Sequence, residues 1–184
     1  MLFMHKKTPY NQCMEFKIPT QVRKAVDALS QAGFEAYLVG GCVRDLMLHR
    51  TPKDWDVATN ALPKDVQAIF PDSVYENDFG TVGVKTESED PSLKIVEITT
   101  YRAEGKYTDK RHPDEVRFAK TIEEDLSRRD FTVNAMAMGW RIANGEERLI
   151  NHAPFALSDM LLIDPFGGQD DLKARIIRTV RNPD

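Results

Sequence analysis

The chain has 184 residues, 41% of them hydrophobic, and its 25 basic against 29 acidic side chains give a formal net charge of −4. This length predicts one well-cored domain, and the acidic balance excludes a surface built throughout for polyanions while leaving enough Lys and Arg for a local basic groove. No apolar run approaches the roughly 18 residues of a membrane-spanning helix, so we expect no membrane association.

The beginning of the chain predicts a leader and one helix. Residues 1–17 lack the apolar centre of a signal peptide, and we interpret them as a loosely ordered leader. Pro19 suits a first helical turn and Gly33 supplies a C-terminal stop. Between them, apolar residues recur at the spacing of one helix face: Val22, Ala25, Val26 and Leu29. We expect this helix to cover one face of the core.

A glycine pair then separates a short strand from a second helix. The apolar run from Ala36 to Val39 predicts a buried strand, and Gly40 and Gly41 break it into a helix over 43–48. Free backbone N–H groups at a helix start bind phosphate, and glycine lets the anion approach. Arg44 lies one turn inside, where it can add a charged contact. The alternative interpretation is a plain strand-to-helix turn.

The two cysteines favour a reducing environment. Cys13 and Cys42 form neither a CxxC pair nor a set spaced for zinc, which indicates a cytoplasmic location. Cys42 lies next to the glycine pair, where a catalytic thiol is one interpretation. We favour a buried small apolar residue, because free cysteine is among the most buried residue types.

The next strand carries two aspartates one residue apart. Proline disfavours helix in the residue before it, so Pro52 ends the preceding helix and Trp55 to Ala58 resumes as strand. In an extended chain Asp54 and Asp56 point to the same face, about 6.6 Å apart along the strand. An isolated D-x-D pair is most often a surface turn or cap. Following a glycine pair and an arginine, it predicts a metal clamp beside a phosphate cradle.

A helix and an antiparallel pair of strands are predicted next. The helix covers 64–70, and the strands cover 79–86 and 93–100 with a polar turn between them. Glu97 on the second strand shares a face with Leu93, Ile95 and Thr99. An acid there is costly unless it lies on a solvated edge or meets a cation. Beside an aspartate pair on a neighbouring strand, a third metal or base carboxylate is the favoured interpretation.

The second half of the chain is more irregular. Residues 101–117 have no apolar period, and they are interpreted either as a solvated surface loop or as a mobile lid near the site. The T-x-x-E pattern from Thr121 to Glu124 predicts a capping box and a short helix. The apolar run 131–140 is expected to be core, interrupted by Asn134. Residues 163–169 contain Pro and a glycine pair, which indicates a hinge or tight turn.

Taken together, these motifs predict a nucleotide site with two magnesium ions. Two or three carboxylates on adjacent strands can hold two such ions roughly 3.5–4 Å apart. One ion lowers the pKa of an attacking hydroxyl and the other stabilises the leaving pyrophosphate, as in nucleotidyl transfer. The candidate catalytic and metal-binding residues are Asp54, Asp56 and Glu97.

The residues that carry these motifs resemble one family. Five segments between about Phe34 and Arg181 match it in order: LVGGCVRD…KDWD, VEITTYR, RHPDEVRF, SRRDFTVNAMA and LIDPFGGQDDL. They are similar to the head domain of class II tRNA nucleotidyltransferases (CCA-adding enzymes) and bacterial poly(A) polymerases. The resemblance implies an α+β fold, namely a polymerase-β-like nucleotidyltransferase head with a five-stranded mixed sheet flanked by helices. It also implies that the loop at 101–117 is a flexible element needed for the change of nucleotide.

The resemblance implies roles for individual residues. Nucleotide binding, including the triphosphate and the ribose, falls to Gly40, Gly41, Arg44, Arg129 and Asp130. Two Mg²⁺ ions fall to Asp54, Asp56 and Glu97. The implied substrates are CTP and ATP, and the implied acceptor is the 3′ end of tRNA. TTYR and the loop after it resemble the tRNA-tailing branch more than the poly(A) branch.

The resemblance also implies a domain plan. We expect a leader at 1–17, the head domain at 18–170 and the start of a truncated neck at 171–184. Family members continue into helical neck, body and tail domains, and the neck reads the base. We therefore expect those domains, or a partner chain, to supply base selection and tRNA binding. The alternatives are a bacterial poly(A) polymerase, transfer of a nucleotide to a protein or small drug, and a non-catalytic RNA-binding module.

Overall fold

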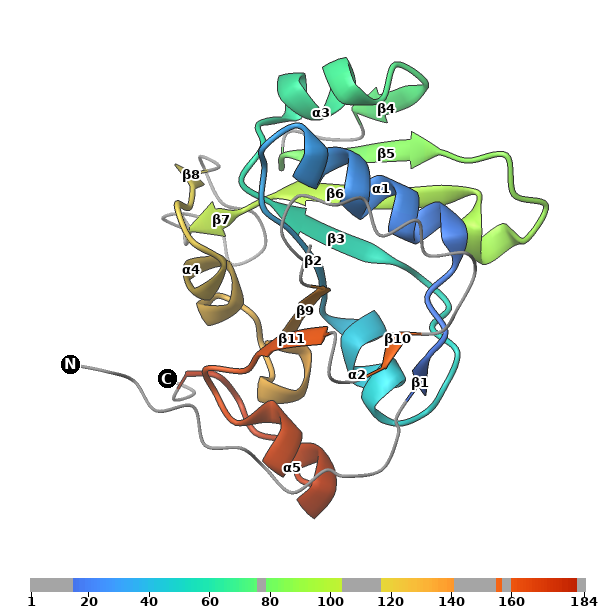
Figure 1. The fold of residues 1–184 in the computed structure, drawn as a ribbon. Helices are drawn as coiled ribbons and strands as arrows, with labels where there is room; N and C mark the ends of the chain where they lie inside the picture. Colours follow the sequence, from blue (N-terminus) through green and yellow to red (C-terminus); the bar gives the residue numbers. More distant parts are fainter. Residues whose placement is uncertain (1–14, 76–78, 104–116, 141–154, 157–159, 182–184) are drawn as a thin grey trace.

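A mixed sheet forms the centre of the molecule (Figure 1). The computed structural model describes residues 15–75, 79–103, 117–140, 155–156 and 160–181. The strands of the sheet are β2 (Ala36–Val39), β3 (Asp56–Thr59), β4 (Ser73–Tyr75), β5 (Thr81–Lys85), β6 (Ile95–Thr100), β9 (Ala137–Trp140) and β11 (Met160–Ile163). Their order is β11-β9-β2-β3-β6-β5-β4, with β3 and β6 parallel and the other neighbours antiparallel. The one parallel step brings β3 beside β6.

Five α-helices surround this sheet in the part of the chain that the structure describes. They are α1 (Thr20–Gln31), α2 (Gly41–Met47), α3 (Pro63–Ile69), α4 (Ile122–Ser127) and α5 (Gly168–Ala174). Two short 3-10 turns, η1 (Pro91–Leu93) and η2 (Thr132–Asn134), join strands to their neighbours. Figure 1 shows α1 lying across the middle strands, with α4 beside the far end of β6. None of the described helices is long and apolar enough to cross a bilayer.

Two apolar clusters form because successive strand residues point to opposite faces of the sheet. Val57 belongs to the larger cluster, which also holds the buried faces of α1, α2 and α3. The next residue, Ala58, belongs to a smaller cluster with Ile122 and Leu126 of α4. Asp56 therefore faces the same side of the sheet as Ala58. This is the side that α1 and α3 leave uncovered.

Two short strand pairs lie outside the main sheet. β1 (Glu15–Phe16) pairs with β10 (Phe155–Ala156), and the Phe16 side chain is buried in the larger cluster. β7 (Arg102–Ala103) pairs with β8 (Arg117–Phe118), so the two ends of the predicted loop are tied together. The rest of that loop, 104–116, lies outside the described residues, as do residues 1–14 of the predicted leader. The division into leader, head and neck stays a prediction.

The structure confirms the predicted α+β class and the mixed sheet, which has seven strands in the described residues rather than five. The strand Ala36–Val39 and the antiparallel pair β5 and β6 are also confirmed. One strand boundary was predicted wrongly. The strand was expected to start at Trp55, with Asp54 in extended chain before it, but β3 starts at Asp56 and Asp54 lies in a bend. The edge strand β4 was not predicted, since its three residues follow Pro71 closely and are too few to show an alternating pattern.

Candidate functional site

The parallel pairing of β3 and β6 sets Asp56 directly beside Glu97. These two residues are Cα partners in the register, and the Glu97 N–H donates to the Trp55 carbonyl at 3.3 Å. Side chains alternate across the sheet, so both carboxylates lie on the face away from α1. Asp56 is half-buried and Glu97 is exposed, on the strand face that also carries Ile95 and Thr99. The sequence-predicted third carboxylate thus lies on the strand next to Asp56.

The two aspartates interact although they do not share a strand. Asp54 is exposed in the bend before β3, while Asp56 is the first residue of the strand. Burial raises the pKa of the Asp56 carboxyl above its ordinary value, and the charge of Asp54 raises it further. The guanidinium groups of Arg129 and Arg102 lower the pKa of Asp56 but do not cancel this effect. Two carboxylates that repel each other in this way favour a bound cation.

The glycine pair lies directly against this carboxylate. Gly40 is the N-cap of α2 and has φ +73° and ψ −133°, a conformation that is nearly restricted to glycine. A Cβ atom on Gly40 would lie 2.7 Å from Arg129 Nη1 and 3.6 Å from Asp56 Oδ2. A Cβ atom on Gly41 would lie 3.5 Å from Arg44 Nη2. The two glycines therefore make room for two guanidinium groups beside the start of α2.

Arg44 is fixed by two neighbours. Its Nε donates to Asp45 Oδ1 at 2.9 Å, and its Nη2 forms an ion pair with the same oxygen at 2.8 Å. Its Nη1 donates to Asn134 Oδ1 at 2.8 Å, which ties α2 to η2. About a third of the Arg44 side chain stays exposed, at 33%. The charge is therefore held in place beside Gly41 and remains open to a ligand.

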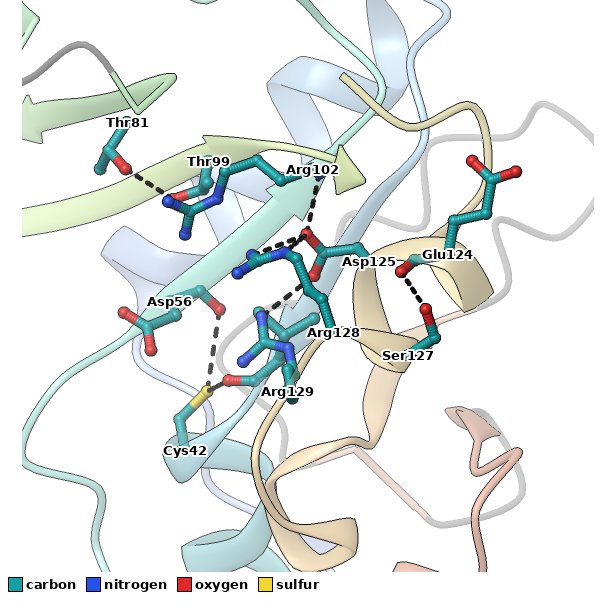
Figure 2. A network of polar contacts seen from close by, with 11 residues as sticks. Cys42, Asp56, Thr81, Thr99, Arg102, Glu124, Asp125, Ser127, Arg128 and Arg129 are labelled. Atoms are coloured by element: carbon teal, nitrogen blue, oxygen red, sulfur yellow. Dashed lines mark hydrogen bonds and ion pairs between the residues drawn. The ribbon is translucent and has the colours of Figure 1, made fainter. Parts of the chain in front are cut away.

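Arg129 reaches the same place from the end of α4. Its Nη2 donates to Asp125 Oδ2 at 3.2 Å (Figure 2). Its Nη1 lies beside Gly40, 2.7 Å from the position that a Cβ atom would take there. Its Nε is buried and has no hydrogen-bond partner among the described residues. A buried donor without a partner is costly, so this guanidinium is suited to bind a further acceptor.

A buried aspartate collects the arginines of this region. Asp125 is 1% exposed, and its Oδ1 accepts from the Arg102 backbone N–H at 3.0 Å and from Arg128 Nε and Nη2 at 3.2 and 2.9 Å. Burial alone would raise the pKa of Asp125, but Arg128, Arg129 and the Arg102 N–H outweigh it and lower that pKa below its ordinary value. Figure 2 shows Asp125 beside Arg102, with Arg129 on the side of Asp56. The Asp125 carboxylate is therefore ionised and structural.

Asp130 and Cys42 complete the neighbourhood. Asp130 is exposed, and its carbonyl accepts from the Val180 N–H at 3.0 Å, so the segment after α5 pairs back onto it. The ribose contact of the Asp130 carboxylate stays a prediction. Cys42 is 2% exposed, its Sγ donates to the Val39 carbonyl at 3.1 Å, and burial raises its thiol pKa to about 11. The preferred interpretation of Cys42 as a buried apolar residue is confirmed.

The carboxylates suit a magnesium ion that is completed by a substrate. In the described part of the chain, no group of three or more His, Cys, Asp or Glu side chains is arranged to hold a metal. Mg²⁺ is usually bound through one or two carboxylates plus substrate phosphates rather than by a protein cage. Asp54 and Asp56 supply oxygen ligands that repel each other, and Glu97 is the register partner of Asp56. These residues fit such an ion.

Sequence reasoning missed three residues that hold the site together, namely Asp45, Asp125 and Asn134. Two of them left a signal. Asn134 interrupts an apolar run, and Asp125 lies three residues after Ile122 on the buried face of α4. A polar residue at a position that the pattern reserves for the core indicates a buried hydrogen-bond partner. Asp45 left none, because acids are common on exposed helix faces.

Comparison with known proteins agrees with this geometry. The CCA-adding enzyme of Geobacillus thermodenitrificans is 44% identical over 157 residues, which are 85% of this chain and 33% of that protein. The crystal structure of Bacillus stearothermophilus CCA-adding enzyme in complex with CTP superposes with a TM-score of 0.65 at 37% identity, covering 89% of this chain and 34% of that one. Thermotoga maritima CCA-adding enzyme complexed with tRNA gives a TM-score of 0.58 at 25% identity, covering 90% of this chain and 34% of that one.

The chain thus spans about a third of the length of the curated relatives it matches. Residues 36–178 match the family described as the poly A polymerase head domain, which is most of the chain. The chain belongs to the poly A polymerase head domain family.

Proposed function

We propose that this chain is the head of a template-independent nucleotidyltransferase that adds CMP and AMP from CTP and ATP to tRNA 3′ ends. The observation that carries the proposal is that Asp56 Oδ2 and Arg129 Nη1 both lie close to Gly40. Each atom is within 4 Å of the position that a Cβ on Gly40 would take. A carboxylate for a metal and a cation for a phosphate lie there side by side. The CCA-adding enzymes among the relatives support tRNA as the acceptor class.

The triphosphate is proposed to lie along the start of α2. Gly40 and Gly41 leave space for an anion, and Arg44 and Arg129 flank it with fixed positive charge. Arginine holds phosphate through paired N–H donors, and Arg44 is already aligned by its two partners. Because this geometry exists before the substrate arrives, binding needs little reordering of side chains.

The reaction is proposed to occur at the carboxylates. Asp54 and Asp56 would hold two magnesium ions with Glu97 beside them, and such ions supply a nucleophilic hydroxyl at neutral pH and charge stabilisation for the leaving pyrophosphate. The protein's own part is positioning. Asp56 is fixed by the β3 and β6 pairing, and Arg129 holds positive charge where the phosphate charge develops.

Base selection and tRNA binding are proposed to need more chain than the head. The relatives are about three times as long as the matched part, which supports additional neck, body and tail domains or a partner chain that supplies them. The bacterial poly(A) polymerase alternative shares the same head. The relatives named CCA-adding enzyme favour the tRNA assignment. A non-catalytic RNA-binding module would not need the carboxylates, yet all three are present. We propose a cytoplasmic location, where tRNA is processed.

A transfer assay tests the proposal. The chain, joined to the C-terminal domains of a matched relative, is incubated with Mg²⁺, labelled CTP or ATP, and a tRNA that lacks its terminal CCA. We expect CMP and then AMP to be added to the tRNA 3′ end. Asp54→Asn and Asp56→Asn are expected to lose this activity, while Asp72→Asn, an exposed aspartate at the far edge of the sheet, keeps it. Label that enters tRNA equally in all variants would refute the assignment.

A further inference from the structure

The position of Arg129 depends on a carboxylate that lies outside the predicted site. Asp125 Oδ2 accepts from Arg129 Nη2 at 3.2 Å, while Asp125 Oδ1 accepts from Arg128 and the Arg102 N–H. Oδ2 thus holds Arg129, while Oδ1 holds Arg128 and the Arg102 backbone. The carboxylate is 1% exposed and cannot shift without breaking these bonds, so it is a rigid anchor behind Arg129.

Asp56 is the competing partner for the same guanidinium. Arg129 Nη1 and Asp56 Oδ2 lie 2.7 and 3.6 Å from a single point, the Cβ position on Gly40. The Arg129 side chain is only 20% exposed, and a largely buried cation must have a partner. If Asp125 lost its charge, Asp56 would be the carboxylate within reach. Arg129 would then close onto it.

We propose that Asp125 is a positioning residue that holds Arg129 beside Gly40 and keeps it from pairing with Asp56. The inference rests on the proposed function, because it takes Arg129 as a phosphate contact and Asp56 as a metal ligand. An Arg129–Asp56 pair would remove both from the substrate at once. The anchor also accepts from the Arg102 backbone N–H, so it joins the start of β7 to α4.

The charge of Asp125 and its shape have separable effects. Asp125→Asn keeps the size of the side chain and an amide oxygen that can accept from the Arg102 N–H. It removes the negative charge that attracts the two guanidinium groups. The substitution therefore perturbs the anchor more than the packing. Because loss of one partner of a buried ion pair also destabilises a fold, stability is measured beside binding.

The test is a double-mutant cycle on nucleotide binding, which separates an effect through Arg129 from a general one. CTP is titrated calorimetrically, with Mg²⁺ present, into the 184-residue chain, Asp125→Asn, Arg129→Ala and the double variant. We expect Asp125→Asn to weaken CTP binding about tenfold or more, as for loss of a charge-assisted hydrogen bond. In the Arg129→Ala background, Asp125→Asn is expected to cause no further loss. Equal losses in both backgrounds would overturn the inference.

Two further variants keep the result decisive. Asp171 is a matched control, since it is 4% exposed, accepts from Thr132 Oγ1 at 2.6 Å and pairs with Arg178 at 3.0 Å. Asp171→Asn is expected to lower the melting temperature and leave CTP affinity within about twofold. If Asp125→Asn does not fold, Asp125→Glu enters the same cycle, because it keeps the charge and moves it by one methylene. Its binding loss is expected to vanish in the Arg129→Ala background, and a loss that persists there overturns the inference.

A third comparison separates the inference from the function it rests on. A wild-type chain that binds no CTP refutes the proposed nucleotide site, and the inference falls with it. A wild-type chain that binds CTP, with Asp125→Asn binding equally well, refutes the inference alone. The proposed function is then untouched, because Arg129 and Asp56 keep their places without the anchor.

Discussion

Replacing Gly40 with alanine tests the closest contact in the site. Gly40 has φ +73° and ψ −133°, and an alanine in this region costs about 1–3 kcal/mol of folding free energy. The new Cβ would also lie 2.7 Å from Arg129 Nη1, so the guanidinium must move to at least 3.4 Å for an ordinary contact. That movement strains the 3.2 Å bond from Arg129 to Asp125.

Two effects are therefore expected from Gly40→Ala. The backbone cost lowers the melting temperature by roughly 2–12 °C, at about 2–4 °C per kcal/mol for a chain of this size. Displacement of Arg129 removes a charge-assisted contact worth about 1.5–3 kcal/mol, which weakens CTP binding by about 10- to 100-fold. Differential scanning calorimetry measures the first quantity and CTP titration with Mg²⁺ measures the second.

Gly33 provides the matched control. It has φ +87°, but no atom lies within 4 Å of the position that its Cβ would take. Gly33→Ala therefore carries a backbone cost of about 1–2 kcal/mol without any displaced side chain. We expect a lower melting temperature and unchanged CTP affinity. The reasoning is refuted if Gly40→Ala binds CTP like the wild type, or if Gly33→Ala weakens binding as much as Gly40→Ala does.

Three further predictions concern stability, pH and substrate choice. Tyr101 is fully buried and its hydroxyl donates to Glu35 Oε2 at 3.0 Å. Tyr101→Phe should therefore lower the free energy of unfolding, measured in urea, by about 1.5–3 kcal/mol and leave CTP binding intact. An unchanged free energy of unfolding would contradict this prediction. Burial raises the pKa of Asp56, so the folded state binds its proton more tightly than the unfolded state and stability falls as pH rises above the ordinary aspartate value. Metal-free Asp56→Asn should therefore be more stable than wild type at neutral pH, by an advantage that shrinks on acidification; a less stable variant would count against the burial argument. The 184-residue chain should bind CTP and ATP weakly and with similar affinity in the presence of Mg²⁺, and a strong preference for one base would refute the assignment of base reading to other domains.

Local sequence patterns predicted the parts of the fold that depend on neighbouring residues. The strand Ala36–Val39 was predictable because an apolar run between glycines has few other structures open to it. The turn at Gly40 and Gly41 and the position of Arg44 beside it were predictable from the same stretch, because Arg44 lies only one helical turn after the glycines. Asp56 and Glu97 were expected on adjacent strands, and the register β3 to β6 places them opposite each other.

Contacts between distant segments were not predictable in the same way. Asp125 and the Arg102 N–H are 23 residues apart, and Arg44 and Asn134 are 90 residues apart. No local period specifies such pairs, because they depend on how the sheet and α4 pack. The extended conformation predicted at Asp54 was wrong for a local reason. A strand boundary can shift by a residue or two without changing the apolar pattern of the sequence.

The central claim is that the aspartate pair and the glycine turn form one site for a nucleotide and its metal. The most direct measurement compares CTP binding with and without Mg²⁺ for the wild-type chain and for Asp56→Asn. We predict that Mg²⁺ strengthens CTP binding in the wild type and has little effect in Asp56→Asn, because Asp56 lies beside both Gly40 and Arg129. Equal strengthening by Mg²⁺ in both proteins would contradict the claim.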